Sequence, residues 1–336
     1  MNVRAAFYER FGTAADVLQV AGKALEKPAR GEVQVQLHAS GINPSDVKKR
    51  AGLRGDFTHD FVIPHSDGAG IISDVGEGIS KDRIGQRVWL YEAQHNRTWG
   101  TAAQSINLPT ERVAPLPDIT SFSEGAAIGI PMMTAHRCLT SYGSVEGKTV
   151  LVTGGQGRVG YYTVQLAKLF GANVITTVSN DEGVSELLEL GADIAVNYKD
   201  TNYPATIQEA RPEGIDLVVD VEFGGNFKAY LPLLKNNSVI ACYASSQQAN
   251  PELPFYDLMF KNIFLHPILV YSMPEEAKTR AVKDINEVLE RGKIKHRIAR
   301  EFGLEEIVEA HETVENSGLR GSVIVTLRGD NHGETL

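Results

Sequence analysis

The chain has 336 residues and a formal net charge of −9, and a prior of one domain per about 150 residues predicts two domains with buried cores. Hydrophobic residues make up 42% and charged residues 22% of the chain, which excludes a disordered or low-complexity protein. The acidic balance disfavours a broad phosphate-binding surface, so we expect no nucleic-acid partner.

The cysteine content and the length of the apolar segments indicate the cellular compartment. The chain has only Cys138 and Cys242, too few for a disulfide framework and without the Cys/His spacing of a structural zinc site. No segment has the pattern of a signal peptide or reaches the roughly 18 apolar residues of a membrane span. We therefore expect a cytoplasmic protein with no membrane partner.

In chain order, the first predicted unit is rich in β-strands. Up to about residue 117, short apolar runs alternate with Gly, Pro and Asn, which predicts antiparallel strands. A helical stretch with capping residues begins near Ser121 and contains Pro131. Strands and helices then alternate, which is typical of a parallel sheet covered on both faces. Strands are expected at 148–153, 173–179, 194–198, 214–221, 236–245 and 262–271, the last interrupted or ended by Pro267, and helices at 161–171 and 182–192.

The C-terminal part predicts a long amphipathic helix at 275–293, followed by a shorter helix and a final strand. This tail is too small for a domain of its own, so we expect it to return to the β-rich unit. The expected organisation is a discontinuous β-rich domain of residues 1–120 and 268–336 around a nucleotide-binding domain of residues 121–267.

The strongest local motif is a glycine-rich segment between a predicted strand and a predicted helix. Gly154, Gly157 and Gly160 are spaced three apart, with Arg158 and Val159 between them. Glycines at this spacing allow a tight turn, a close approach of the backbone to a pyrophosphate and close packing of helix on strand. The helix N-terminus adds N–H groups and a partial positive charge. The motif in this context predicts a dinucleotide site rather than an ordinary turn.

The residues at the end of the next predicted strand indicate whether the cofactor is NADPH or NADH. NAD sites usually place an Asp or Glu there to bind the ribose hydroxyls. Here Ser179 and Asn180 follow the strand, and both can donate to a 2′-phosphate. Arg158 either adds positive charge or is a solvated surface residue, and Asp181 and Glu182 oppose a phosphate. The pattern favours NADPH over NADH.

Several segments in order carry a resemblance to a known family. They are GINPSD at 41–46, IPHSDGAG at 63–70, GIPMMTAHRCL at 129–139, VLVTGGQGRVG at 150–160 and the C-terminal segment at 304–327. Together they resemble the zinc-free quinone oxidoreductase branch of the medium-chain dehydrogenase/reductase superfamily, which includes ζ-crystallin. The resemblance covers nearly the whole chain.

The resemblance implies an α/β protein with a GroES-like β-rich catalytic domain and a Rossmann domain, a doubly wound parallel sheet of strand order 3-2-1-4-5-6. It implies NADPH in the cleft between these domains and hydride transfer to a quinone or another activated double bond, such as an α,β-unsaturated carbonyl. It also implies a homodimer or homotetramer joined through the last Rossmann strands, which here include 262–271.

The resemblance also allows a prediction about whether the protein binds zinc. The zinc alcohol dehydrogenases have a Cys and a His where this sequence has Asn43 and Ser66, and residues 88–100 contain no Cys for a structural zinc lobe. Asn43 and Ser66 are not typical zinc ligands, so we expect no metal site. Without zinc to polarise an alcohol, the expected reaction is reduction of an acceptor that is already electrophilic.

The first motif contains the candidate catalytic residues. By resemblance, Asn43 and Asp46 lie beside the nicotinamide and the substrate, and Asn43 orients one of them, because hydride transfer depends mainly on positioning. Lys48 stands where ζ-crystallin-like proteins often have Tyr. It is either a donor to a developing enolate or hydroquinone oxygen, or a rim lysine paired with Asp46.

The resemblance implies further cofactor contacts. Thr134 is expected near the nicotinamide and its ribose, and Tyr198 by the adenosine 2′-phosphate or, alternatively, as an aromatic cap on the third strand. The backbone of Tyr243, Ala244 and Ser245, which follow the fifth strand, is expected at the nicotinamide half of the cofactor.

Two histidines depart from the family pattern. His65 replaces a common Gly and is either a hydrogen-bonded structural residue, the favoured interpretation, or a proton donor. His136 replaces a common Tyr, and we interpret it as a packing residue. Cys242 is interpreted as a buried strand residue, because no activating base accompanies it at a known spacing.

Two other functions are alternatives. Enoyl-thioester reductases of the same superfamily carry a Tyr proton donor shortly after the NPSD motif, where this chain has Leu53 and Arg54. A sensor or structural protein that binds NADPH without turnover would also keep the glycine loop. Turnover with a small electrophilic acceptor distinguishes the leading hypothesis from the second alternative.

Overall fold

The computed structural model describes residues 1–316 and 318–327. These residues form two compact units. The first unit contains Met1–Ile130 and the described part of Val282–Leu336, and the second contains Pro131–Ala281.

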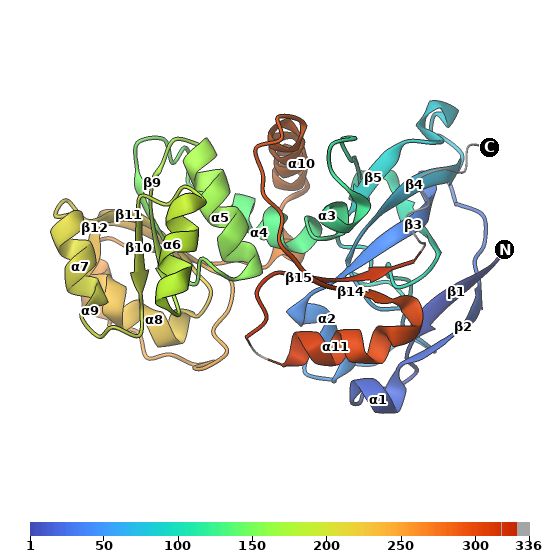
Figure 1. Cartoon of the computed structure of the whole chain (residues 1–336), viewed down its shortest axis with the longest axis horizontal. Helices are drawn as coiled ribbons and strands as arrows, with labels where there is room; N and C mark the ends of the chain where they lie inside the picture. The colour runs from blue at the N-terminus through green and yellow to red at the C-terminus, as the bar shows by residue number, and fades with distance from the viewer. Residues whose placement is uncertain (317, 328–336) are drawn as a thin grey trace. The chain divides into compact units, whose positions relative to one another are not determined.

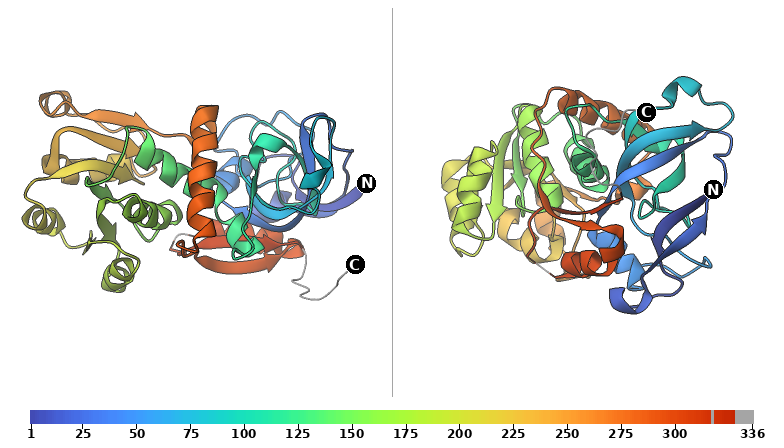
Figure 2. Two further views of the ribbon diagram at one scale, coloured as in Figure 1. Left: turned by 90° about the horizontal axis from the view of Figure 1, so that it is seen from above. Right: turned by 45° about the vertical axis from the view of Figure 1, so that its right-hand side comes forward.

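The divisions between the units fall inside two continuous helices. They are α4 (Gly129–Thr140) and α10 (Glu275–Glu290), the long orange helix in the left view of Figure 2. Both divisions therefore lie later in the chain than the boundaries after residues 120 and 267 that the sequence pattern suggested. A change of hydrophobic periodicity marks where an element begins, but it does not show to which unit each half of a helix packs.

The first unit is built on a seven-stranded sheet of order β14-β15-β3-β4-β5-β7, with β6 paired to β3. Its pairs are antiparallel except for β14 with β15. The strands are β3 (Glu32–Ile42), β4 (Asp67–Val75), β5 (Arg87–Leu90), β6 (Ser105–Pro109), β7 (Val113–Pro115), β14 (Ile298–Gly303) and β15 (Ser322–Thr326). A separate antiparallel pair consists of β1 (Asn2–Phe7) and β2 (Gln19–Ala24).

Strand β3 lies at the centre of this unit because it pairs with β4, β6 and β15. Its Val33, Val35 and Leu37 side chains are fully buried, and burying each such side chain contributes about 1.5–3 kcal/mol. In the pairing of β15 with β3, Val323 lies opposite Ile42. The C-terminal segment therefore joins the sheet formed by the N-terminal segments.

Four helices lie wholly within the described part of the first unit. Ser121 and Glu124 form the expected capping box at the start of α3, because each side chain accepts the other residue's backbone N–H, at 2.8 and 3.2 Å. The helices are α1 (Ala14–Val17), α2 (Pro44–Arg50), α3 (Phe122–Ala126) and α11 (Ile307–Glu315). The short 3-10 turns are η1 (Lys81–Arg83), η2 (Thr110–Arg112) and η5 (Leu304–Glu306).

The second unit is a six-stranded sheet of order β10-β9-β8-β11-β12-β13, in which all pairs are parallel. Numbered along the chain within this sheet, the order is 3-2-1-4-5-6, which confirms the expected Rossmann topology. The strands are β8 (Thr149–Val152), β9 (Asn173–Val178), β10 (Ile194–Asn197), β11 (Ile215–Asp220), β12 (Leu234–Cys242) and β13 (Phe264–Pro267).

Helices cover both faces of this sheet. Figure 1 shows α5 (Arg158–Leu169) and α6 (Asp181–Glu189) on one side and α7 (Tyr203–Ala210) on the other. Central strand β8 is buried throughout, which explains its continuous apolar sequence.

In the part of the chain that the structure describes, no helix is long and apolar enough to cross a membrane. The cytoplasmic location stays a prediction.

Some elements of the second unit were not expected. The sequence pattern did not indicate α7, α8 (Phe223–Tyr230) or α9 (Phe255–Phe260), which are short. Helix α8 contains two consecutive glycines, poor helix formers that hide its periodicity. Strand β13, in contrast, ends at Pro267 as expected, because proline has no N–H for the sheet. The turn η4 (Val270–Ser272) follows it, and η3 (Leu231–Leu233) follows α8.

Candidate active site

The glycine loop connects β8 to α5 and is closely packed. Gly154 has a φ of +64°, a left-handed conformation that favours glycine. A Cβ at Gly155 would lie 2.1 Å from Thr176 Oγ1, and one at Gly160 would lie 2.4 Å from the carbonyl oxygen of Gly154. The backbone therefore comes as close to β9 and to the first turn of α5 as only glycines allow.

The N–H groups of the loop glycines are used inside the protein. Gly154 donates to Thr177 Oγ1 at 3.0 Å, and Gly155 donates to the carbonyl oxygen of Thr177 at 2.9 Å. Gly157 donates to the carbonyl oxygen of Gly154 at 2.9 Å. Gly154, Gly155 and Gly157 thus use their amides to shape the loop.

The first turn of α5 begins at Arg158 and includes Val159 and Gly160. Its N-cap residue is Gly157, so no capping side chain lies over the helix N-terminus. The first N–H groups of a helix lack intrahelical partners and carry partial positive charge. This end of α5 has the features of an anion site, and the half-buried Arg158 places a cationic side chain in the same turn.

The residues after β9 are held by the loop and by α6. Asn180 is the N-cap of α6, and its Oδ1 accepts the N–H of Gly183 at 3.0 Å. The Ser179 N–H and hydroxyl both donate to Gln156 Oε1 at 3.4 Å, and Gln156 Nε2 donates to Glu186 Oε2 at 3.2 Å. Sequence reasoning missed Gln156, although a long polar side chain inside a glycine loop is a visible signal.

The other predicted cofactor residues of this unit lie after neighbouring strands. Tyr198 follows β10 and is 47% exposed. Its N–H donates to the carbonyl oxygen of Val178 at 2.9 Å. Tyr243, Ala244 and Ser245 follow β12. Because all strands of the sheet are parallel, these residues and the glycine loop lie at the same carboxyl edge, where open α/β sheets bind ligands.

Helix α4 carries Thr134 and His136, which are both buried. The His136 ring lies edge-on to Phe170 with centroids 6.0 Å apart, which agrees with a packing role. Cys138 and Cys242 are buried free thiols. Burial raises the pKa of Cys138, and it raises that of Cys242 to about 11. Neither thiol is activated as a nucleophile.

In the first unit, the structure brings together Asn43 and two carboxylates. Asn43 is the N-cap of α2. Its N–H donates to Asp46 Oδ2 at 2.7 Å, and its Nδ2 donates to Asp67 Oδ2 at 2.6 Å. The Asp67 carboxylate also accepts the N–H of Ile130 at 2.9 Å. Asn43, Asp46 and Asp67 are buried, whereas Lys48, further along α2, is half-buried.

Asp67 was not predicted as a site residue. Burial raises its pKa well above the ordinary value, and the charges of Asp46 and Glu92 raise it further. The hydrogen bonds from Asn43 and Ile130 act in the opposite direction. The sequence signal for Asp67 was its position directly after Ser66, in a motif already singled out. A carboxyl group in this environment is a candidate for a functional role, because perturbed titration marks such groups.

His65 is a buried residue with a left-handed backbone, at a φ of +78°. Its Nδ1 lies 2.8 Å from Ser40 Oγ, and its Nε2 lies 2.9 Å from His311 Nε2. Burial lowers the pKa of His65 to about 3, so it is neutral at physiological pH. These contacts support the structural interpretation of His65, and its positive φ is a conformation that glycine adopts more readily.

The residues at the family's zinc positions do not fit zinc. Asn43 donates its amide N–H to Asp67, and Ser66 offers only a buried hydroxyl. Within residues 1–316 and 318–327, no group of three or more His, Cys, Asp and Glu side chains is placed to hold a metal ion.

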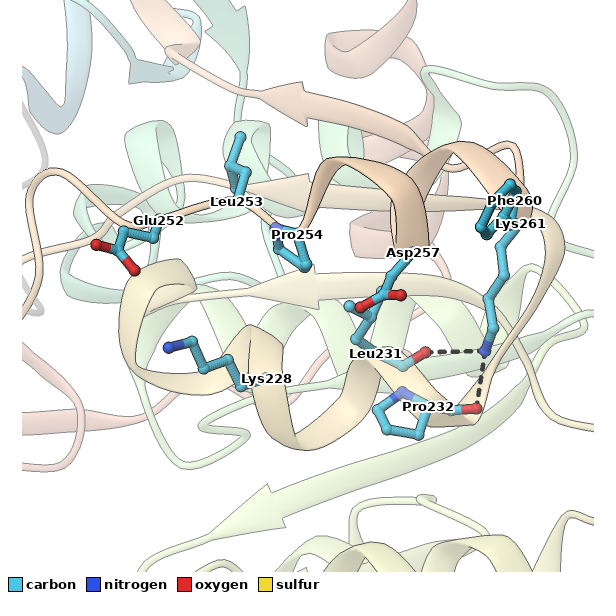
Figure 3. A pocket seen from close by; sticks show the side chains of 9 residues that line it. All are labelled: Lys228, Leu231, Pro232, Glu252, Leu253, Pro254, Asp257, Phe260 and Lys261. Carbon is cyan, nitrogen blue, oxygen red and sulfur yellow. Dashed lines mark hydrogen bonds between the residues drawn. The ribbon is translucent and has the colours of Figure 1, made fainter.

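A cavity of about 630 Å³ lies elsewhere in the second unit. Figure 3 shows Lys261 extending to the carbonyl oxygens of Leu231 and Pro232, at 3.0 and 2.9 Å, and its Nζ also donates to that of Leu234 at 2.8 Å. Since Leu234 is the first residue of β12, the cavity lies away from the carboxyl edge that carries the glycine loop. We therefore do not assign the cofactor to this cavity.

Comparisons with known proteins agree with this architecture. A family model described as alcohol dehydrogenase GroES-like domain matches residues 29–118, and one described as zinc-binding dehydrogenase matches residues 159–287. The quinone oxidoreductase of Rattus norvegicus is 31% identical over 306 residues, which cover 89% of this chain and 90% of the rat protein.

Solved structures show the same fold. A mycobacterial quinone oxidoreductase has a TM-score of 0.85 at 24% identity, with 97% of this chain and 100% of that chain covered. The Escherichia coli quinone oxidoreductase complexed with NADPH has a TM-score of 0.83 at 24% identity, with 96% of this chain and 100% of that chain covered. The chain belongs to the quinone oxidoreductase branch of the medium-chain dehydrogenase/reductase superfamily and is an oxidoreductase.

Proposed function

We propose that this protein is a zinc-independent, NADPH-dependent reductase that transfers a hydride to a quinone or to an α,β-unsaturated carbonyl compound. The observation that carries the cofactor assignment is the arrangement after β9. Where NAD sites place a carboxylate, this chain has Ser179 and Asn180, and Asn180 also caps α6. The nearby Asp181 carboxylate accepts from Asn197 Nδ2 at 3.0 Å.

The chain's own groups supply positioning. The α5 N-terminus and Arg158 are suited to the cofactor's phosphates, and Ser179, Asn180 and Tyr198 to its adenosine end. We assign Thr134 and residues 243–245 to the nicotinamide half. When bound, NADPH supplies the hydride, and this transfer needs little more than correct alignment of the two reacting carbons.

The substrate groups are Asn43, Asp46 and Lys48. We propose that Asn43 orients the acceptor or the nicotinamide, since Asp46 and Asp67 fix its backbone and its amide. Reduction adds one hydride and one proton to the acceptor, and we assign Lys48 as the donor to the developing oxyanion. With an amide and a hydroxyl at the zinc positions, the acceptor must be electrophilic without metal assistance.

The test is NADPH oxidation by the chelator-treated protein with 1,4-benzoquinone, 9,10-phenanthrenequinone, simple enones and crotonyl-CoA, each repeated with NADH. We expect turnover with quinones or enones and a preference for NADPH. Turnover with crotonyl-CoA alone would indicate an enoyl-thioester reductase. Tight NADPH binding without any turnover would indicate a sensor or structural protein, and a stoichiometric zinc ion required for activity would contradict zinc independence.

We also propose a homodimer or homotetramer joined through β13. This strand is at the edge of the second unit's sheet, and its Phe264 and the nearby Leu269 are 44% and 52% exposed. Apolar side chains on a sheet edge favour association. Light scattering on the wild type and on Phe264→Lys tests this, because a wild type that is monomeric at micromolar concentration would contradict it.

A further inference from the structure

A buried carboxylate lies next to the glycine loop and is saturated with donors. Asp220, the last residue of β11, is fully buried. Its Oδ1 accepts from Thr153 Oγ1 at 2.6 Å, Asn226 Nδ2 at 2.9 Å and the N–H of Glu222 at 3.0 Å. Its Oδ2 accepts from the Tyr230 hydroxyl at 2.7 Å. One side chain thus joins the ends of β8 and β11 to α8.

Thr153 transmits this arrangement to the loop because it directly precedes Gly154. Its hydroxyl gives its only proton to Asp220 and accepts the N–H of Val221 at 3.0 Å. Its own N–H donates to the carbonyl oxygen of Val219 at 3.0 Å. The hydroxyl and the backbone of Thr153 are therefore both held by the neighbouring strand.

The residue after Thr153 is where the chain turns. Gly154 adopts the left-handed conformation, and a Cβ there would lie 2.9 Å from Val221 Cγ1. The contacts that hold Thr153 therefore lie directly before this turn. The loop amides that follow, those of Gly154 and Gly155, donate to Thr177.

We infer that Asp220, acting through Thr153, is a positioning residue for the dinucleotide loop. The inference rests on the proposed function in that NADPH binds at this loop. Asp220 does not contact the cofactor in this account. It fixes the point at which the loop begins, and the loop in turn places the N-terminus of α5.

The alternative is that the network only stabilises the second unit. Two single hydroxyl contacts separate these roles, because the Thr153 hydroxyl connects Asp220 to the loop, whereas the Tyr230 hydroxyl connects Asp220 to α8. Thr153→Val removes the first contact with nearly the same shape. Tyr230→Phe removes the second contact and serves as the matched control, and Thr153→Ser retains the hydroxyl.

The experiment titrates NADPH and NADH into the wild type and the three variants by nucleotide fluorescence, and records the Tm of each without nucleotide. We expect Thr153→Val to raise the Kd for NADPH about tenfold, which equals about 1.4 kcal/mol. Tyr230→Phe should leave the Kd within about twofold of the wild type although its Tm falls. Thr153→Ser should bind like the wild type.

Equal Kd values for the wild type and Thr153→Val would overturn the inference and leave the proposed function intact. So would Kd increases in Thr153→Val and Tyr230→Phe that simply follow their losses of Tm. A wild type that binds neither nucleotide would overturn the proposed function and the inference together. Thr153→Ala, which also lacks the hydroxyl, gives the same test if Thr153→Val does not fold.

Discussion

The Nε2 atoms of His65 and His311 lie 2.9 Å apart in the interior of the first unit, with their rings stacked at a centroid distance of 5.0 Å. A hydrogen bond between two imidazole nitrogens needs one donor and one acceptor, so at least one ring must stay neutral. The bond joins the end of the loop before β4 to α11, which are far apart in the sequence. Protonation of both rings breaks it.

This pair predicts that the protein loses stability at mildly acidic pH. Burial lowers the pKa of His65 to about 3, and burial, His65 and Arg50 hold the pKa of His311 well below its ordinary value. In the unfolded chain both rings titrate near about 6.5. Below that pH the unfolded state binds more protons, so stability present above pH 6.5 is lost as the pH falls, by up to about 1.4 kcal/mol per histidine per pH unit.

Urea unfolding between pH 5 and 7.5 measures this slope. Asp67 acts in the opposite direction, because its raised pKa lets the native state take up a proton first. A comparison with His311→Gln isolates the histidine contribution, since the variant lacks one titrating ring. We expect a shallower pH dependence in the variant, and an unchanged slope would contradict the account.

The contact between Asn43 and Asp67 predicts a specific loss of activity. Asp67→Asn keeps the shape but replaces one of the two carboxylate oxygens, which accept from the Asn43 amide and the Ile130 N–H, with an NH2 donor. We expect kcat/KM for a quinone to fall about tenfold or more, because small losses of alignment are costly in hydride transfer. The Kd for NADPH should change much less than kcat/KM, since the glycine loop, which we assign to the phosphates, belongs to the other unit.

The matched control for this prediction is Asp74→Asn. Asp74 lies on the same strand, β4, and its carboxylate accepts the N–H of Val75 at 2.9 Å. It should retain wild-type kinetics. Equal kcat/KM values for the wild type and Asp67→Asn would remove Asp67 from the site.

The packing of Gly155 predicts that even a methyl group is harmful. A Cβ would lie 2.1 Å from Thr176 Oγ1, whose hydroxyl donates to the carbonyl oxygen of Val152 at 3.0 Å. We expect Gly155→Ala to lower the free energy of unfolding by about 1–3 kcal/mol and to weaken NADPH binding. Denaturant unfolding and fluorescence titration measure the two effects.

Gly303→Ala is the control for this change, because its Cβ would meet only a flexible Glu306 carboxylate at 3.4 Å. It should alter stability little. If Gly155→Ala were as stable as Gly303→Ala and bound NADPH normally, close packing of the loop would not be needed for its function.

The position of Asn180 predicts a change of cofactor preference without a loss of stability. Asn180→Asp places a carboxylate at the end of β9 and keeps an oxygen that caps α6, because Asp is an equally good N-cap. We expect the ratio of NADPH to NADH affinity to fall about tenfold, since the new charge repels a 2′-phosphate and accepts from ribose hydroxyls. Asn180→Ser is the uncharged control, and an unchanged ratio in Asn180→Asp would contradict the NADPH assignment at this position.

The parallel sheet was predictable because its strands are continuous apolar runs, and the glycine loop because its spacing is tied to a strand and a helix. Helix α8 could not be predicted, since its glycines weaken the helical pattern. Local patterns also do not show which distant polar groups meet. Asn43 and Asp67 are separated by 24 residues and His65 and His311 by 246, and only the fold brings each pair together.

The glycine loop also shows that residue spacing does not predict hydrogen-bond partners. The spacing of Gly154, Gly157 and Gly160 indicated a phosphate site, but it did not show that the amides of Gly154 and Gly155 are used within the protein. That depends on Thr177, a residue of the next strand. Packing between strands decides which groups shape a site and which groups face its ligand.

The central claim is hydride transfer from NADPH to an electrophilic acceptor without zinc. Its most direct test is a single-turnover reaction in which chelator-treated protein, saturated with NADPH, is mixed without oxygen with 9,10-phenanthrenequinone. The account predicts that NADPH disappears in equal amount to the hydroquinone formed. Bound NADPH that this quinone leaves unoxidised, or a reaction that occurs only after zinc is restored, would contradict it.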